Sequence, residues 1–161
     1  ILELLKEAEN HPKEKMEKIY LALVSDDFSV TGLKHFFDIL LAQKEGAVLW
    51  HCSAGKDRVG TTAALLLTAL GVDREVIIQD YLLTNGYLEP ETEAMIAKVA
   101  AKVPNERILN GIRILNGAER SYIESMFAET ERQCGSTEAY LQERLGLTDE
   151  KREMLREMYL V

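Results

Sequence analysis

A cysteine and an arginine lie in one short segment of this chain, at a spacing that suits covalent phosphoryl chemistry. The segment is His51–Gly60, with the sequence HCSAGKDRVG, so that five residues separate Cys52 from Arg58. A cysteine thiolate is a strong nucleophile, and a guanidinium can hold two oxygens of a phosphoryl group at once. We therefore expect Cys52 to act as a nucleophile and Arg58 to bind the group that it attacks.

The residues around this pair predict the elements that would position it. The apolar run 47–50 predicts a buried strand, and the apolar segment 61–70 predicts a helix in the centre of a domain. Between a strand and a helix N-terminus, the backbone N–H groups of a tight loop converge on one point. There they bind an anion and lower the pKa of a thiol. Gly55 and Gly60 allow the backbone angles and close approach that such a loop needs.

Helices are expected along most of the remaining chain. Apolar residues recur at helical spacing over 16–24 and over 33–41. Ser29 is a candidate N-cap for the second of these helices, and Gly46 is a candidate stop. Further helices are expected over 73–86, 91–103, 122–130 and 138–145, with a last one capped by Thr148.

The single predicted strand raises the question of its partners. The backbone groups of a buried strand must pair with other strands, and no other segment of this sequence has a convincing strand pattern. The sequence therefore predicts that the sheet is completed from outside the chain, by an upstream segment of the protein or by a second molecule.

The segment HCSAGKDRVG resembles the HCxxGxxR signature loop of the protein tyrosine phosphatases and related lipid phosphatases. Its form HCxxGKDR, followed by an apolar helix, LGV and DYLLTN, is more specific. It is similar to the bacterial and fungal tyrosine phosphatase family that includes secreted phosphatases of mycobacteria and Listeria. The C-terminal sequence CGSTEAYLQERLGLTDEKREMLREMYL resembles the closing GS-x-x-YL-x-x-LG-L pattern of that family. The resemblance extends from about Met16 to the C-terminus.

This resemblance implies an α/β fold, in which a phosphatase-like central sheet is flanked by helices. The chain would supply mainly helices and the strand before the active-site loop. We expect residues 1–161 to form a single catalytic domain. The NFRDxGG-like segment in the N-terminal portion of the family has no counterpart in this sequence, so the chain resembles the C-terminal part of a longer phosphatase.

The resemblance also implies hydrolysis of phosphomonoesters through a cysteinyl-phosphate intermediate, without a metal or a cofactor. The substrates would be phosphotyrosine proteins, with phosphoinositides as a further class. Cys52 and Arg58 would be catalytic, and His51 would order the loop and help to keep the thiol ionised. The residues expected to bind substrate are His51, Ser53, Ala54, Gly55, Lys56, Val59 and Gly60.

Three loop positions carry additional expectations. Asp57 precedes the arginine, where myotubularin-type lipid phosphatases place an aspartate that can serve as general acid. Its alternative role is structural, pairing with an arginine or capping loop amides; the general acid would then come from a separate loop in an N-terminal part, as the resemblance to tyrosine phosphatases also allows. Lys56 would either favour substrates with several phosphates from the loop rim or remain a solvated lysine. Val59 replaces the Thr or Ser that assists the departing thiolate in most relatives, so we expect a slower second step.

Composition limits the partners. Lysine and arginine number 19 against 27 acidic residues, a formal charge of −8, which disfavours nucleic acid and anionic membranes. No apolar run is long enough to span a bilayer, so we expect no integral membrane contact and a phosphorylated protein or phosphoinositide as partner. Cys52 and Cys134 form no zinc-ligand motif. Both a cytoplasmic location and secretion into a host fit the sequence.

Other protein classes fit parts of the same pattern. Rhodanese-type sulfurtransferases and arsenate reductases also use a cysteine in an anion-binding loop, although neither typically combines HCxxGKDR with this helix. A pseudophosphatase, which binds phosphorylated partners without turnover, or an inactive fragment is the second alternative. The intact Cys52 favours catalysis.

Overall fold

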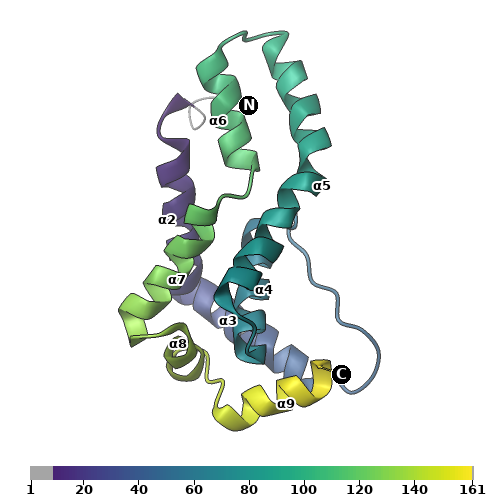
Figure 1. Cartoon of the computed structure of the whole chain (residues 1–161), viewed down its shortest axis with the longest axis vertical. Helices are drawn as coiled ribbons and strands as arrows, with labels where there is room; N and C mark the ends of the chain where they lie inside the picture. The colour runs from purple at the N-terminus through teal and green to yellow at the C-terminus, as the bar shows by residue number, and fades with distance from the viewer. Residues whose placement is uncertain (1–8, 161) are drawn as a thin grey trace.

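The computed structural model describes residues 9–160, in which the ordered elements are helices (Figure 1). Their bounds are α2 Pro12–Ser25, α3 Asp27–Ala42, α4 Asp57–Leu70, α5 Arg74–Ala100, α6 Glu106–Asn116, α7 Arg120–Cys134, α8 Thr137–Glu143 and α9 Asp149–Tyr159. None of the helices in these residues combines the length and the apolar character needed to cross a bilayer.

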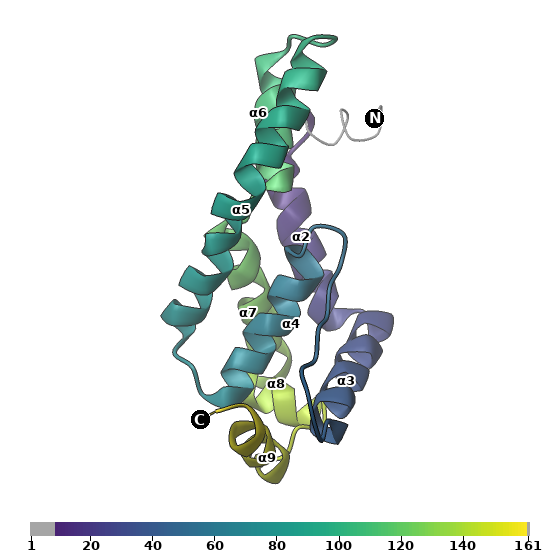
Figure 2. The same cartoon turned by 90° about the vertical axis from the view of Figure 1, so that its right-hand side faces the viewer.

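The main core lies where α2, α4 and α7 pack together, with α3, α8, α9 and the first half of α5 around them (Figures 1 and 2). Tyr20, Leu65 and Ile123 are fully buried there, one from each central helix. Burial of such a side chain stabilises the fold by roughly 1.5–3 kcal/mol. Helix α4 is therefore held on several sides, and its N-terminus, where the HCSAGKDR loop ends, is fixed in position.

A two-helix arm projects from this body (Figure 2). The second half of α5 and the whole of α6 form it, and they share a separate small core of Ile96, Ile108, Leu109 and Ile112. The arm returns to the body through residues 115–118, which pass beside the loop before α4. One wall of the loop is thus built from residues about 60 positions away in sequence.

The expected α/β fold with a central sheet is wrong for this structure, because residues 9–160 contain helices and no strand. The run Ala47–Trp50, expected to be a strand, lies in a long connection between α3 and α4. A strand needs hydrogen bonds to a neighbouring strand, and the described part of the chain supplies none. Trp50 packs edge-on against Phe36, with ring centroids 5.2 Å apart, while Leu49 is 89% exposed.

Helix α5 runs without a break through the point where two separate helices were expected. The sequence predicted an end at Asn85–Gly86, but the Asn85 side chain is engaged in a tertiary contact. Its Nδ2 donates to the carbonyl of Ala118 at 2.8 Å, and its Oδ1 accepts the N–H of Ala118 at 2.7 Å. Pro90 also lies inside the helix. A proline in a helix interior crowds the backbone carbonyl of the residue four positions earlier, here Gly86, and leaves that carbonyl without its helical hydrogen bond.

Two further expectations about helices need correction. Helix α6 was not predicted, although Asn105 caps it by accepting the N–H groups of Arg107 and Ile108. The N-cap of α3 is Asp26, which accepts the N–H of Ser29 at 3.0 Å, so Ser29 is not the cap. The expected cap of the last helix is confirmed, because Thr148 accepts the N–H of Lys151.

Gly60 sets how closely α4 approaches α5, which makes its replacement a test of the packing. A Cβ at this position would lie 2.9 Å from Cδ2 and 3.0 Å from Cε2 of Tyr81. We expect Gly60→Ala to lower the free energy of unfolding by about 1–3 kcal/mol, because Tyr81 is buried and has little room to move. Urea unfolding followed by circular dichroism measures the change.

The matched control is Gly86→Ala. Gly86 lies inside α5, and a Cβ there meets no atom within 4 Å. This change should raise the free energy of unfolding by about 0.5–1 kcal/mol, since alanine favours a helix interior over glycine. Equal effects of the two substitutions would contradict the close approach at Gly60.

Candidate active site

The loop His51–Lys56 ends directly on the first residue of α4, Asp57. Gly55 has a φ of +68°, a left-handed conformation that favours glycine. The loop therefore turns back on itself before the helix begins, and its backbone N–H groups face the same side as the unpaired N–H groups of the first helical turn.

Cys52 lies partly buried inside this turn. Burial acts to raise the pKa of its thiol, but the backbone N–H groups of Val59, Gly55, Ala54 and Lys56 outweigh burial, and the pKa is lowered. Donors on four different residues thus favour the thiolate. The same donors can bind the oxygens of a phosphoryl group held at the sulfur, which is the anion-binding arrangement expected from the sequence.

Arg58 and His51 lie at the edges of the loop. Arg58 is exposed, and its Nη2 lies 3.5 Å from Oγ of Ser53, so the guanidinium reaches back over the loop. His51 is also exposed, and its Nδ1 donates to the backbone carbonyl of Cys52 at 3.2 Å. This bond fits the expectation that His51 orders the loop.

Lys56 lies in the interior, contrary to the expectation of a lysine at the loop rim or in solvent. Its side chain is only 3% exposed. Nζ donates to the carbonyls of Leu115 at 2.7 Å and Gly117 at 2.9 Å, and it lies 3.3 Å from Oδ1 of Asp57. Burial lowers the pKa of Lys56, whereas the charges of Asp57 and Cys52 act in the opposite direction. Lys56 therefore holds the loop against the C-terminal end of α6 and the residue that follows it.

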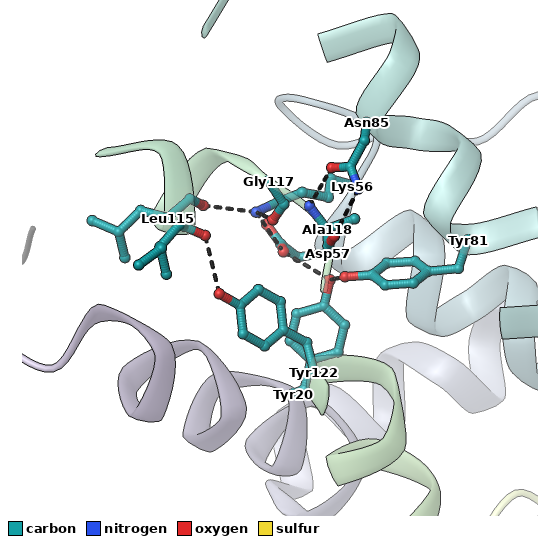
Figure 3. A network of polar contacts seen from close by, with 10 residues as sticks. Tyr20, Lys56, Asp57, Tyr81, Asn85, Leu115, Gly117, Ala118 and Tyr122 are labelled. Atoms are coloured by element: carbon teal, nitrogen blue, oxygen red, sulfur yellow. Dashed lines mark hydrogen bonds and ion pairs between the residues drawn. The ribbon is translucent and has the colours of Figure 1, made fainter. Parts of the chain in front are cut away.

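Asp57 is held by a chain of buried hydroxyl groups (Figure 3). Tyr20 of α2 donates to Oδ1 of Asp57 at 2.9 Å. The hydroxyls of Tyr20 and Tyr81 lie 2.6 Å apart, and since the one proton of Tyr20 points to Asp57, Tyr81 is the donor between them. Burial raises the pKa of both tyrosines well above the usual range, so both stay protonated. The partners of Asp57 are thus Lys56 and Tyr20 and not an arginine.

Sequence reasoning missed the residues that support the loop from a distance. Tyr20 belongs to the apolar helix face expected over 16–24, and Tyr81 to the helix expected over 73–86, and neither was expected to contact the loop. The available signal was that a tyrosine hydroxyl in a core needs a hydrogen-bond partner. Asn85 and the carbonyls of Leu115 and Gly117 gave no local signal, because their contacts with Ala118 and Lys56 join distant parts of the chain.

Of the two threonine hydroxyl groups that follow Val59 closely in α4, one is bonded to the backbone and the other is buried with no hydrogen-bond partner among the described residues. Thr62 donates its hydroxyl to the backbone carbonyl of Arg58 at 2.6 Å. Thr61 is buried, and it lies in the pocket between α3 and α4. Val59 itself contributes its backbone N–H to Cys52 and has no hydroxyl to add. Among residues 9–160, His, Cys, Asp and Glu side chains form no cluster of three or more that could hold a metal ion.

The two thiols provide a test of the loop. Burial raises the pKa of Cys134, whereas that of Cys52 is lowered. At pH 7 we expect iodoacetamide to alkylate Cys52 at least about tenfold faster than Cys134, because the thiolate is the reactive form. The alkylation rate is measured across a pH series. The Cys134→Ser chain reports the thiol of Cys52 alone, and the Cys52→Ser chain reports that of Cys134.

The lowered pKa of Cys52 also predicts how the free energy of unfolding changes with pH. Because the pKa of Cys52 is lowered by folding, its contribution to the free energy of unfolding is present above about pH 8.5 and is lost as the pH falls through the folded value. In denaturant, the two thiols should titrate together. If the alkylation rates of the two thiols had the same pH midpoint in the folded chain, the anion-binding geometry of the loop would be contradicted.

Comparison with known proteins places this loop in a family. The model of the tyrosine phosphatase family matches residues 3–161. A tyrosine-protein phosphatase of Nostoc commune is 48% identical over 56 residues, which cover 35% of this chain and 19% of that protein. The triple specificity protein phosphatase PtpB of Mycobacterium tuberculosis is 50% identical over 52 residues, which cover 32% of this chain and 18% of that protein.

A longer match has lower identity. A putative tyrosine-protein phosphatase of Cupriavidus necator is 28% identical over 127 residues, which cover 78% of this chain and 45% of that protein. The chain thus spans less than half the length of these curated relatives. The family model matches nearly the whole chain, and the resemblance drawn from the loop is confirmed: the chain belongs to the tyrosine phosphatase family.

Proposed function

We propose that this chain hydrolyses phosphomonoesters on phosphotyrosine proteins through a cysteinyl-phosphate intermediate. The observation that carries the proposal is the thiol of Cys52, whose pKa is lowered by four backbone N–H donors at the start of α4. Arg58 lies beside it and reaches over the loop. Such a site offers a nucleophile and a set of oxygen-binding donors at one point.

In the first step, the Cys52 thiolate attacks phosphorus. The S–P bond forms and the bond from phosphorus to the ester oxygen breaks, so that the leaving oxygen must gain a proton. The backbone N–H groups and Arg58 bind the remaining phosphoryl oxygens while charge develops on them. Asp57 is our candidate for the proton donor: it would give up the proton that it takes from water in the second step of the preceding turnover, and Tyr20 and Lys56 hold its position.

In the second step, a water oxygen attacks the phosphoryl group, and its proton passes to Asp57. The S–P bond breaks and Cys52 departs as a thiolate, which is stabilised by the same N–H donors. This step would be slower than in relatives with a hydroxyl after the arginine, because Val59 cannot donate to the departing sulfur and Thr62 is bonded to Arg58.

Hydrolysis of p-nitrophenyl phosphate tests the proposal. We expect turnover by the chain, inhibition by vanadate, and a loss of about 10³-fold or more in Cys52→Ser, which lacks the nucleophile. Cys134→Ser is the matched control and should keep the activity, since Cys134 lies at the end of α7. Absence of turnover in a folded preparation that still binds phosphate would support a phosphate-binding module instead.

Val59→Thr tests the assignment of the slow step. The chain should release a burst of p-nitrophenolate and then turn over slowly, while Val59→Thr should raise the steady rate about three- to tenfold and shrink the burst. A hydrogen bond of about 1 kcal/mol to the departing thiolate produces a change of this size. Val59→Ala removes bulk without adding a hydroxyl and should bring no gain. Linear product release by the original chain would show that the second step is not limiting.

A further inference from the structure

The carboxylate of Asp57 is held through one of its two oxygens. Tyr20 donates its hydroxyl proton to Oδ1 at 2.9 Å, and Nζ of Lys56 lies 3.3 Å from the same oxygen (Figure 3). Within residues 9–160, the hydrogen bond and the ion pair of this side chain therefore both fall on Oδ1. The side chain is partly exposed and lines the pocket beside Ser53 and Ala54. The two oxygens of Asp57 thus have different surroundings.

The direction of the hydroxyl chain is fixed at its far end. The backbone N–H of Glu119, at the start of α7, donates to the hydroxyl oxygen of Tyr81 and acts to lower its pKa, although burial raises that pKa overall. A tyrosine hydroxyl has one proton to give. Reversing the chain would turn the proton of Tyr81 towards the N–H of Glu119 and would bring two donors face to face. The donors therefore run in one direction, from Glu119 through Tyr81 and Tyr20 to Asp57.

This order of donors decides which oxygen of Asp57 can carry a proton. A protonated Oδ1 would face the O–H of Tyr20 and the ammonium group of Lys56, and both of these groups are donors. A proton that Asp57 takes up must therefore lie on Oδ2. Tyr20 and Tyr81 are 0% and 4% exposed, so water does not replace them in the chain.

We infer that Tyr20 and Tyr81 are positioning residues that hold Oδ1 of Asp57 as a fixed acceptor and reserve Oδ2 for proton exchange with the leaving group and with water. The inference rests on the proposed function and adds to it the oxygen that reacts and the residues that select it. Because the tyrosines belong to α2 and α5, the orientation of the acid at the start of α4 depends on the packing of three helices.

The proton balance of the proposed reaction is kept at Oδ2. As the bond from phosphorus to the ester oxygen breaks, the proton on Oδ2 passes to that oxygen. As water attacks the phosphoryl group, one of its protons passes to Oδ2, which restores the starting state of Asp57. The protons of Tyr20 and Tyr81 stay in place in both steps, since their role is to orient the carboxylate.

Leaving groups of different basicity test this role. The substrates are phenyl phosphate, whose departing oxygen needs a proton, and p-nitrophenyl phosphate, whose departing oxygen is stabilised by the nitro group. Tyr20→Phe should lower kcat/KM about tenfold for phenyl phosphate and at most about twofold for p-nitrophenyl phosphate, because a misplaced acid matters most where the proton is needed. Tyr81→Phe should lower kcat/KM for phenyl phosphate about threefold, since Tyr20 keeps its hydroxyl but loses the donor that sets its direction.

Tyr140→Phe is the matched control. Tyr140 is as fully buried as Tyr20, and it donates to the carbonyl of Val24 at 2.9 Å, a hydrogen bond in which Asp57 takes no part. This substitution should lower the urea midpoint about as much as Tyr20→Phe does and leave the ratio of the two kcat/KM values unchanged. A second control is Tyr20→Phe in an Asp57→Asn chain, where the ratio should not change further, because Tyr20 acts through Asp57.

The outcomes separate this inference from the proposed function. Equal losses for the two substrates in Tyr20→Phe, the same change of ratio in Tyr140→Phe, or a further change of ratio in the Asp57→Asn chain would overturn the inference alone, provided that turnover requires Cys52. Absence of p-nitrophenyl phosphate turnover by the original chain would overturn the proposed function, and the role of the two tyrosines with it.

Discussion

The buried ammonium group of Lys56 is the contact on which the geometry of the loop depends. It joins the loop to the carbonyl of Leu115 at the end of α6, to that of Gly117 just after α6, and to the carboxylate of Asp57 at the start of α4. A buried lysine without partners would be very costly. Its contacts therefore specify one position of the loop relative to the helices, and in that position the N–H groups of four residues point at the Cys52 sulfur.

Further polar contacts extend this connection to the rest of the body. Tyr20 joins α2 to Asp57, and Tyr81 joins α5 to Tyr20. The side chain of Asn85 forms hydrogen bonds through Nδ2 and Oδ1 to the backbone of Ala118. These bonds hold residues 115–118, which lead back from the arm, beside α5. Figure 3 shows two sets of contacts close together: one runs from Tyr81 through Tyr20 and Asp57 to Lys56, and the other joins Asn85 to Ala118. The loop is thus supported from α2, α5 and the end of α6, and α5 and α6 also line a pocket beside the loop at Ser53 and Ala54.

The lowered pKa of Cys52 was predicted correctly because its cause is local, whereas the strand and the break in α5 were wrong because their causes are not. The lowered pKa of Cys52 follows from N–H groups within seven residues of it in the chain, so spacing and glycine positions were enough to anticipate it. The strand at Ala47–Trp50 was wrong because a strand depends on a partner that the described residues do not contain. The break at Asn85–Gly86 was wrong because a turn-forming residue was instead used for a contact with Ala118.

The amino-acid sequence by itself determined the chemistry available at the loop: a cysteine, an arginine six residues further on, a glycine that accepts a positive φ, and a helix that begins at the end of the loop. These features interact over a few residues and need no distant partner. Tertiary structure decided the role of Lys56, which the sequence left between a second phosphate contact and a solvated charge. Its carbonyl partners lie 59 and 61 residues away in the sequence. Only the folded structure brings them to the ammonium group, and a buried charge needs such polar partners.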